Sequence, residues 1–225
     1  MSVITDSQTS VGKVVTTLKR AIFTGELQPG EQLREVLLTE HLSVSRNSVR
    51  EALRVLSANG LTSHMPNKGV RVRKLSISEV EEIFKTRLII ERQAVLNANF
   101  CEASLLQQLA AAMNDYAKMA KTNDPVTVAE AHNQFHAALV GITGSKHLME
   151  LEHSLMQELQ VVIASVDSDR NDLTNEIKKH QALTNMLLEK RIDEAVEWIE
   201  NDLALTKDFV IQHLCAPKQK FKIHT

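Results

Sequence analysis

The sequence contains few residues that break helices, cross-link chains or stack rings. Of its 225 residues, 7 are glycine, 4 are proline, 2 are cysteine and 4% are aromatic. Scarce glycine and proline, beside abundant leucine, alanine, glutamate and lysine, indicate helices. The two cysteines, Cys101 and Cys215, belong to no metal-binding or redox motif. We therefore expect reduced thiols in a cytoplasmic protein.

Long apolar runs are also lacking. No stretch is long enough to cross a bilayer, and the N-terminus has no secretory apolar segment, so we expect no membrane partner. The apolar content of 43% is ordinary for a globular protein and permits a packed core. The length fits one large domain or two small ones.

Charge is distributed unevenly, although the net charge is only −2. Residues up to Lys74 contain eleven basic and six acidic side chains, a net charge of +5, and the remainder carries −7. A basic N-terminal part predicts contact with a polyanion. Chance clustering in a small domain would give the same pattern.

The first 75 residues combine helical and extended patterns. Apolar spacing predicts helices over 10–23 and 34–41, and a third that begins near Ser45, a good N-cap, and ends at Asn59-Gly60. Residues 61–65 are then extended, 66–69 form a turn, and 70–73 alternate apolar and basic side chains like a half-exposed strand. Three helices followed by two strands describe a winged helix-turn-helix.

The third helix carries the side chains expected to read DNA. A recognition helix places its N-terminal residues against base edges in the major groove. Arginine there suits guanine, asparagine suits adenine, and hydroxyls at a helix N-terminus suit phosphate oxygens. A merely solvated charged face is the alternative. The expected contacts are Ser45, Arg46, Asn47, Ser48 and Arg50, with Lys68 and Gly69 at the tip of the wing.

Several motifs of this part occur in a fixed order. They are Gly25-x-Leu27-x-Pro29-Gly30-x-x-Leu33, Val44-Ser45-Arg46-x-x-Val49-Arg50-Glu51-Ala52-Leu53 and Gly69-Val70-x-Val72. Over roughly the first third of the chain, they resemble the GntR family of bacterial regulators. The resemblance implies a homodimer on a roughly palindromic DNA site. It also implies operator contacts from Arg34, Arg46, Arg50 and Gly69.

From residue 76 onward the pattern predicts six helices and no strand, over 76–98, 102–121, 125–142, 145–168, 172–189 and 191–214. The predicted fold is therefore mainly α. A winged helix-turn-helix occupies 1–75 and an antiparallel all-α bundle of six helices occupies 76–215. Residues 216–225 form a tail that we expect to be frayed and solvated, with a contribution of its lysines to DNA affinity as the alternative.

Four polar side chains interrupt the apolar stripes of these helices. His132 and His136 share one stripe, His180 lies on another, and Asp202 lies on the stripe assigned to Leu205 in the last helix. Three neutral imidazoles and one carboxylate suit zinc, nickel or a similar divalent cation. The alternatives are hydrogen-bonded core histidines and an ion pair between Asp202 and a histidine.

The helical part resembles the FCD ligand-binding domain of the FadR subfamily, in its six-helix, VanR-like version. Many members carry an Asp-x-x-x-His pair followed by two further histidines. In this sequence His132 stands at the first of these positions and Asp202 at the last, so the two residue types have changed places. The change is consistent with a retained metal site, and also with a lost site rebuilt as polar contacts.

Arg87 and Glu91 lie one turn apart on the stripe of the first helix of this part. One interpretation is a salt bridge between them. The other is that Arg87 binds a carboxylate of an effector. The resemblance implies small organic acids as effectors, in some members coordinated directly by the metal.

These patterns together predict a DNA-binding transcriptional regulator, a repressor before an activator, controlled by a small organic acid bound near a metal. A metal-free site for an acyl-CoA-type effector is an alternative. A metal-dependent enzyme is a remote one, because Asn133 stands where a zinc protease would carry its general-base glutamate. We therefore expect no enzymatic activity.

Overall fold

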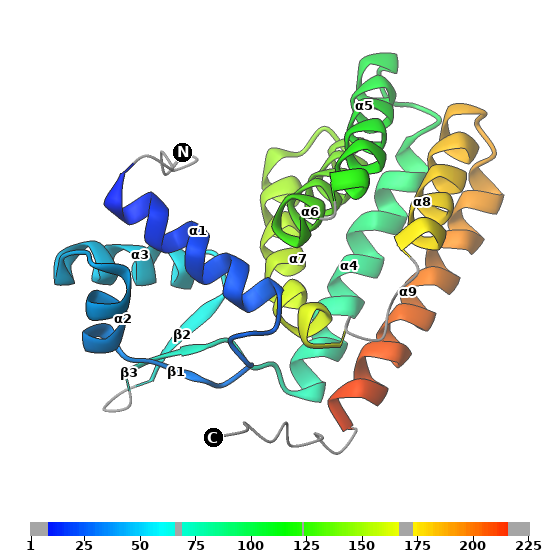
Figure 1. Cartoon of the computed structure of the whole chain (residues 1–225). Helices are drawn as coiled ribbons and strands as arrows, with labels where there is room; N and C mark the ends of the chain where they lie inside the picture. Colours follow the sequence, from blue (N-terminus) through cyan, green and yellow to red (C-terminus); the bar gives the residue numbers. More distant parts are fainter. Residues whose placement is uncertain (1–8, 66–68, 123, 167–172, 216–225) are drawn as a thin grey trace.

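The computed structural model describes residues 9–65, 69–122, 124–166 and 173–215, so Lys68 and the tail over 216–225 lie outside the described ranges. An N-terminal part of three helices and a small sheet lies beside an all-helical C-terminal part (Figure 1). The mainly α fold predicted from the sequence is confirmed.

The N-terminal part has the elements of a winged helix-turn-helix. They are α1 (Ser10–Phe23), β1 (Gln32–Leu33), α2 (Glu35–Leu42), α3 (Arg46–Ala58), β2 (Thr62–Met65) and β3 (Gly69–Val72). Strand β3 lies between β1 and β2 in an antiparallel sheet, with Leu33 opposite Val70 and Met65 opposite Gly69. Strand β1 was not predicted from the sequence, because two residues are too few to show an alternating pattern.

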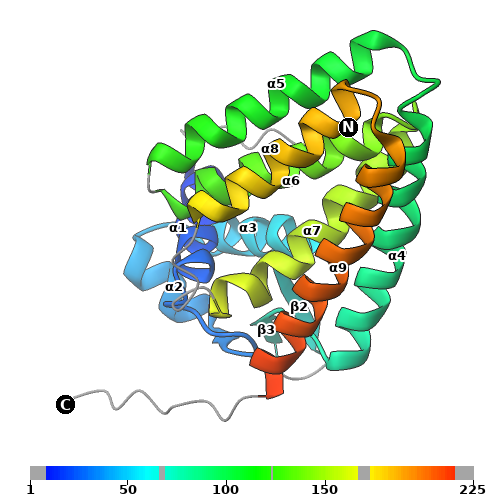
Figure 2. The ribbon, with the colours of Figure 1, turned by 90° about the vertical axis from the view of Figure 1, so that its right-hand side faces the viewer.

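The C-terminal part is a bundle whose helices match the predicted ranges closely. It contains α4 (Ile77–Asn97), α5 (Ala103–Met119), the short 3-10 helix η1 (Ala120–Thr122), α6 (Pro125–Gly141), α7 (Lys146–Val166), α8 (Leu173–Leu188) and α9 (Ile192–Cys215). Helix α9 runs along α4, and α5 and α8 lie together on another side of the bundle (Figure 2). No helix in the described ranges is long and apolar enough to cross a bilayer.

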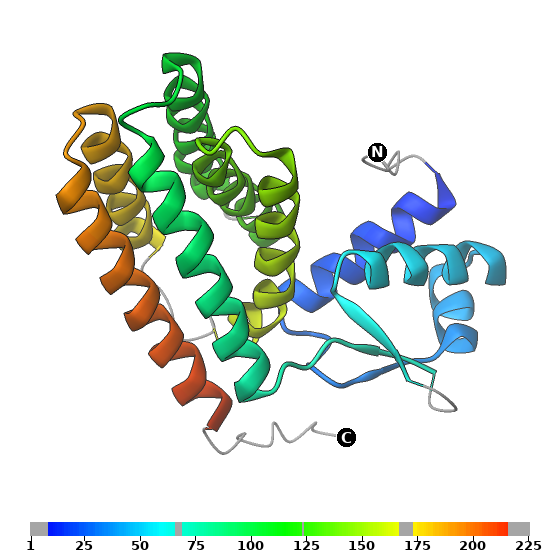
Figure 3. The ribbon, with the colours of Figure 1, turned by 180° about the vertical axis from the view of Figure 1, so that it is seen from behind.

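The two parts share one of the two hydrophobic cores. The larger core lies within the bundle, and the smaller one is built mainly from α1, α3 and the sheet. Three residues of the bundle complete the smaller core, namely Val126 and Ala129 of α6 and Val161 of α7. Helices α6 and α7 therefore form the side of the bundle that faces the winged helix-turn-helix, as the view from behind shows for α7 (Figure 3).

Candidate metal centre and nucleic-acid interface

The N-terminus of α3 presents polar side chains to solvent. Ser45 caps the helix, because its Oγ accepts a hydrogen bond from the backbone nitrogen of Ser48 at 3.1 Å. Arg46 and Asn47 are exposed, and Arg46 forms no ion pair with any residue in the described ranges. Arg50 instead donates through Nε to Glu35 Oε2 of α2 at 2.7 Å. Of the two arginines at this end of α3, Arg50 is therefore held by an ion pair within the described residues and Arg46 is not.

Two further expected DNA contacts lie at the edges of this surface. Arg34 is exposed and precedes α2 as its N-cap residue. Gly69 begins β3 at the tip of the wing with φ of +75°, a conformation that favours glycine over residues with a Cβ atom. Lys68, beside it, lies outside the described residues. Of the expected contacts, Arg34, Arg46, Asn47 and Gly69 are exposed, and their role in binding DNA stays a prediction.

The three predicted histidine ligands converge in the bundle. His132 and His136 come from α6 and His180 from α8. Their Nε2 atoms lie 3.1 Å apart for His136 and His132, 3.2 Å for His132 and His180, and 3.3 Å for His180 and His136. Three nitrogens bound to one cation at about 2.0–2.1 Å would stand about 3.0–3.4 Å apart. The donor set and its spacing therefore fit a divalent metal.

Neighbouring groups fix the orientation of the rings. His180 Nδ1 lies 2.7 Å from the Glu176 carbonyl oxygen, which can only accept, so Nδ1 carries the proton and the Nε2 lone pair faces the other histidines. Tyr116 packs on His132 with ring centroids 5.0 Å apart, and Phe135 packs on His180 at the same separation. Burial lowers the pKa of His136 to about 4, so this ring is neutral at neutral pH, as a metal ligand must be.

A cluster of buried charges lies directly behind His136. Arg87 pairs through Nη2 with Glu91 Oε1 at 2.6 Å and through Nε with Glu152 Oε1 at 2.9 Å. Glu91 and Glu152 are 0% exposed. Burial opposes ionisation of Glu91, but the charge of Arg87 outweighs it and lowers the pKa to about 2. Burial, aided by the charge of Glu91, raises the pKa of Glu152 to about 8, so Glu152 holds a proton at neutral pH.

The structure shows the salt bridge that was one interpretation of Arg87 and Glu91. Both ion pairs of the Arg87 guanidinium are made with carboxylates of the chain itself, and its side chain is 4% exposed. The other interpretation, an effector carboxylate on Arg87, gains no support from this geometry.

Asp202, the fourth predicted ligand, does not join the histidines. The three imidazoles form a group whose ligand atoms all lie within 4.8 Å of one another, and Asp202 is outside that group. Its carboxylate lies 3.5 Å from Lys179 Nζ, and its side chain is 17% exposed. The inward face assigned to α9 from the sequence was wrong at Leu205, which is 68% exposed. The buried stripe follows Ala195, Ile199, Leu203 and Val210, so Asp202 lies at its edge.

Glu152 was not predicted as a site residue, although the sequence carries a signal for it. Glu152 precedes Met156 by four residues and Leu159 by seven, so it lies on the apolar stripe of α7. The same criterion, a polar residue at a position that demands an apolar one, had identified the histidines. The contact between Glu91 and His136 was also missed, since it joins two helices that are far apart in sequence.

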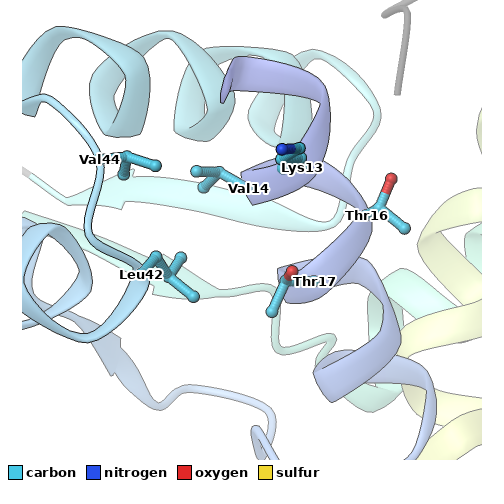
Figure 4. A pocket seen from close by; sticks show the side chains of 6 residues that line it. All are labelled: Lys13, Val14, Thr16, Thr17, Leu42 and Val44. Carbon is cyan, nitrogen blue, oxygen red and sulfur yellow. The ribbon is translucent and has the colours of Figure 1, made fainter. Parts of the chain in front are cut away.

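An open groove of about 380 Å³ lies elsewhere, on the N-terminal part. It is lined by Lys13, Val14, Thr16 and Thr17 of α1 together with Leu42 and Val44 (Figure 4). The lining contains no histidine or carboxylate. The groove therefore lacks the metal-binding chemistry of the three-histidine cluster.

Comparison with known proteins establishes the family. The profile described as bacterial regulatory proteins, gntR family, matches residues 11–72, and the FCD domain profile matches residues 82–205, more than half of the chain. The chain belongs to the GntR family and carries an FCD domain. It is accordingly a DNA-binding transcriptional regulator rather than an enzyme.

Individual relatives agree with this family. The transcriptional regulator YdhC of Bacillus subtilis (strain 168) is 32% identical over 139 residues, which cover 60% of this chain and 62%, less than two thirds, of that protein. The transcriptional repressor GlaR of Escherichia coli (strain K12) is 29% identical over 221 residues, covering 89% of this chain and 90% of GlaR. A GntR transcriptional regulator from Rhodococcus sp. RHA1 has a similar structure, with a TM-score of 0.72 at 25% identity, covering 90% of this chain and 97% of that one.

Proposed function

We propose that this regulator is a repressor whose FCD domain holds a divalent metal, zinc or nickel, on His132, His136 and His180. A small organic acid completes the coordination and controls DNA binding. The observation that carries this proposal is the convergence of three Nε2 atoms within 3.1–3.3 Å of one another. Repression is supported by GlaR, which is named a repressor and aligns with most of this chain.

The three imidazole nitrogens support a cation without an excess of negative charge beside them. Behind His136, the ionised Glu91 pairs with Arg87 and Glu152 holds a proton, so this cluster adds no net charge. A metal ion held by three neutral imidazoles keeps its positive charge, and it has positions open for an oxygen ligand. When bound, the metal would supply a Lewis acid that attracts a carboxylate. Because Arg87 is already paired, we assign the effector carboxylate to the metal and not to Arg87.

Helix α6 offers a route from this site to the DNA-binding domain. Its N-cap residue Asp124 pairs with Arg20 of the winged helix-turn-helix at 2.7 Å, and Glu130 within the helix pairs with Lys19 at 2.5 Å. Two of the three histidines follow on the same helix. We infer that occupancy of the site shifts α6 and so changes the placement of the two recognition helices in a homodimer on two half-sites.

The metal site is tested by measuring metal content and affinity. Purified protein is incubated with zinc or nickel, desalted and analysed by mass spectrometry. We expect close to one metal per chain for the wild type and its loss in His132→Ala and His180→Ala. His153→Ala, at a half-buried histidine of α7, is the matched control and should retain the metal. Metal retained by His180→Ala, or absent from the wild type, would contradict the site.

One more variant decides the role of Asp202. Because Asp202 lies outside the histidine group, Asp202→Asn should bind zinc as the wild type does. A large loss of affinity in this variant would restore the four-ligand set predicted from the sequence.

DNA recognition is tested with duplexes selected from a random pool by the wild-type protein. In fluorescence anisotropy titrations, Arg46→Ala should lose about 1–3 kcal/mol of binding free energy and relax the preference at one base pair. Lys85→Ala, which removes the same charge from an exposed position of α4, should bind DNA as the wild type does. Acetate, malate and citrate are then titrated into the zinc-loaded complex, and release of DNA by any of them supports the effector class. Unaltered affinity and preference in Arg46→Ala would remove that residue from the interface.

A further inference from the structure

The Nδ1 atom of His136 lies between two groups that make opposite demands on it. Glu91 Oε2 is 3.3 Å away and Arg87 Nη2 is 3.2 Å away. An ionised carboxylate only accepts hydrogen bonds, and a guanidinium only donates them. Nδ1 must therefore carry a proton to bond Glu91, and must offer a lone pair to bond Arg87. A neutral imidazole can satisfy only one partner at a time, and the choice fixes its tautomer.

The tautomer of His136 matters because its other ring nitrogen, Nε2, lies at the proposed metal site. Ligation of a metal by His136 Nε2 requires a lone pair there, so the proton must lie on Nδ1 and point to Glu91. Without a cation, three nitrogens at 3.1–3.3 Å need an N–H group between them. His180 Nε2 is fixed as an acceptor by the Glu176 carbonyl group. His136 can supply the donor, because Arg87 can donate to its other nitrogen.

We propose that Glu91 is a positioning residue that holds His136 in its ligating tautomer. Metal loading then replaces the hydrogen bond from Arg87 to His136 by one from His136 to Glu91. The inference rests on the metal centre proposed above. It adds a buried carboxylate on α4 to the set of residues that determine metal affinity. Metal-ligating histidines commonly donate their other N–H to such a carboxylate, which orients the ring and raises its basicity.

Two variants with the same chemical change separate this role from a structural one. Glu91 and Glu152 are both fully buried and both pair with Arg87, but Glu91 alone of the two hydrogen-bonds His136 in the described structure. Glu91→Gln can turn its amide NH₂ toward Nδ1 and so favours the non-ligating tautomer. Zinc affinity, measured against a chelating dye, should fall about 10–100-fold. Glu152→Gln should stay close to the wild-type value.

The tautomer itself is measurable in the wild-type protein by NMR. Long-range ¹H–¹⁵N spectra of protein labelled with [¹⁵N]histidine show which ring nitrogen carries the proton, and His136→Gln identifies the signal. We expect His136 to be protonated at Nε2 in metal-free protein and at Nδ1 after zinc is added. This measurement remains available if Glu91→Gln fails to fold.

The outcomes distinguish this inference from the function on which it rests. If the wild type binds no zinc, the metal centre and the role of Glu91 are both overturned. If the wild type binds zinc and Glu91→Gln binds it equally well, the metal centre stands and the role of Glu91 is wrong. Protonation of His136 at Nδ1 in both states would overturn the exchange of hydrogen bonds.

Discussion

Removal of the Arg87 guanidinium should destabilise the FCD domain far more than removal of an equally short salt bridge on its surface. In Arg87→Met the apolar stem is largely kept, but the ionised Glu91 and its neighbour Glu152 remain buried without a cation. Breaking a buried ion pair by removing one partner costs about 3–5 kcal/mol, because the remaining charge cannot return to water. That is a large part of the total stability of a domain, roughly 5–15 kcal/mol.

The assay is urea unfolding of metal-free protein, followed by tryptophan fluorescence. Trp198 is the single tryptophan of the chain and contacts His180, with ring centroids 6.5 Å apart, so its emission reports on the FCD domain. With a urea dependence of about 2 kcal/mol per molar, the expected loss lowers the unfolding midpoint by about 2 M. The double variant Arg87→Met/Glu91→Gln removes the stranded charge and should recover at least half of the loss.

Helix α4, which carries Arg87, also offers a matched control. Arg92 Nε lies 2.6 Å from Glu200 Oε1, but the two side chains are 45% and 46% exposed. An exposed ion pair contributes about 0–1 kcal/mol, so Arg92→Met should unfold close to the wild type. Equal effects of Arg87→Met and Arg92→Met would refute the reasoning, since burial would then make no difference. Failure of the double variant to recover stability would show that charge is not the cause.

Further predictions concern pH and the contact between the domains. The raised pKa of Glu152 means that the folded protein keeps a proton that the unfolded chain releases above its ordinary pKa of 4.5. The unfolding free energy of the metal-free wild-type protein should therefore fall by about 2 kcal/mol between pH 6.5 and pH 8. Glu152→Gln should lack this contribution, and urea titrations at both pH values measure the difference. Val161→Ala deletes part of a side chain that is 1% exposed and should lower stability by about 1.5–3 kcal/mol; a change below about 0.5 kcal/mol in thermal unfolding would contradict its place in the shared core. Gly60→Ala adds a Cβ atom 2.7 Å from Glu158 Cγ at φ of +69°, and differential scanning calorimetry should show a loss of about 1–2 kcal/mol from the left-handed backbone alone.

The sequence was sufficient to predict the elements whose signals are local. Apolar spacing located the helices because each stripe repeats over several turns, and Ser45 marked the start of α3 through its preference for capping positions. The three histidines were predicted for the same reason, because each interrupts an apolar stripe. Strand β1 gave no such signal, because its two residues form a strand only by pairing with β3.

Pairings between distant helices could not be predicted in this way. Asp202 was assigned to the metal because Leu205 was taken to face inward, and an error of one position in the stripe of α9 moves a side chain from the centre of a bundle to its edge. Arg50 was assigned to DNA without its partner Glu35, which lies fifteen residues away on α2. The contacts of Glu91 and Glu152 around His136 depend on how α4, α6 and α7 cross. The apolar pattern of one helix does not determine these crossings.

The position of the histidines along α6 suggests why this helix, and not α8, should carry the signal to DNA. Val126 and Ala129 belong to the core of the winged helix-turn-helix, and His136 follows Val126 by ten residues, about 15 Å along the helix axis. We expect α6 to move as one unit between these two points, so that a shift at its histidines reaches its docked end. Helix α8 contributes His180 but no residue to the shared core in the described ranges. A ligand that draws His132 and His136 toward His180 would therefore move the DNA-binding domain through α6. Helix α7 also contacts that domain, through the ion pair of Glu158 with Arg73 and through Val161 in the shared core, so it would either oppose this movement or move with α6. Under the proposed function, the coupling free energy depends on the packing of the proposed metal site and of the shared core, and a variant at either place should alter DNA release without contacting DNA.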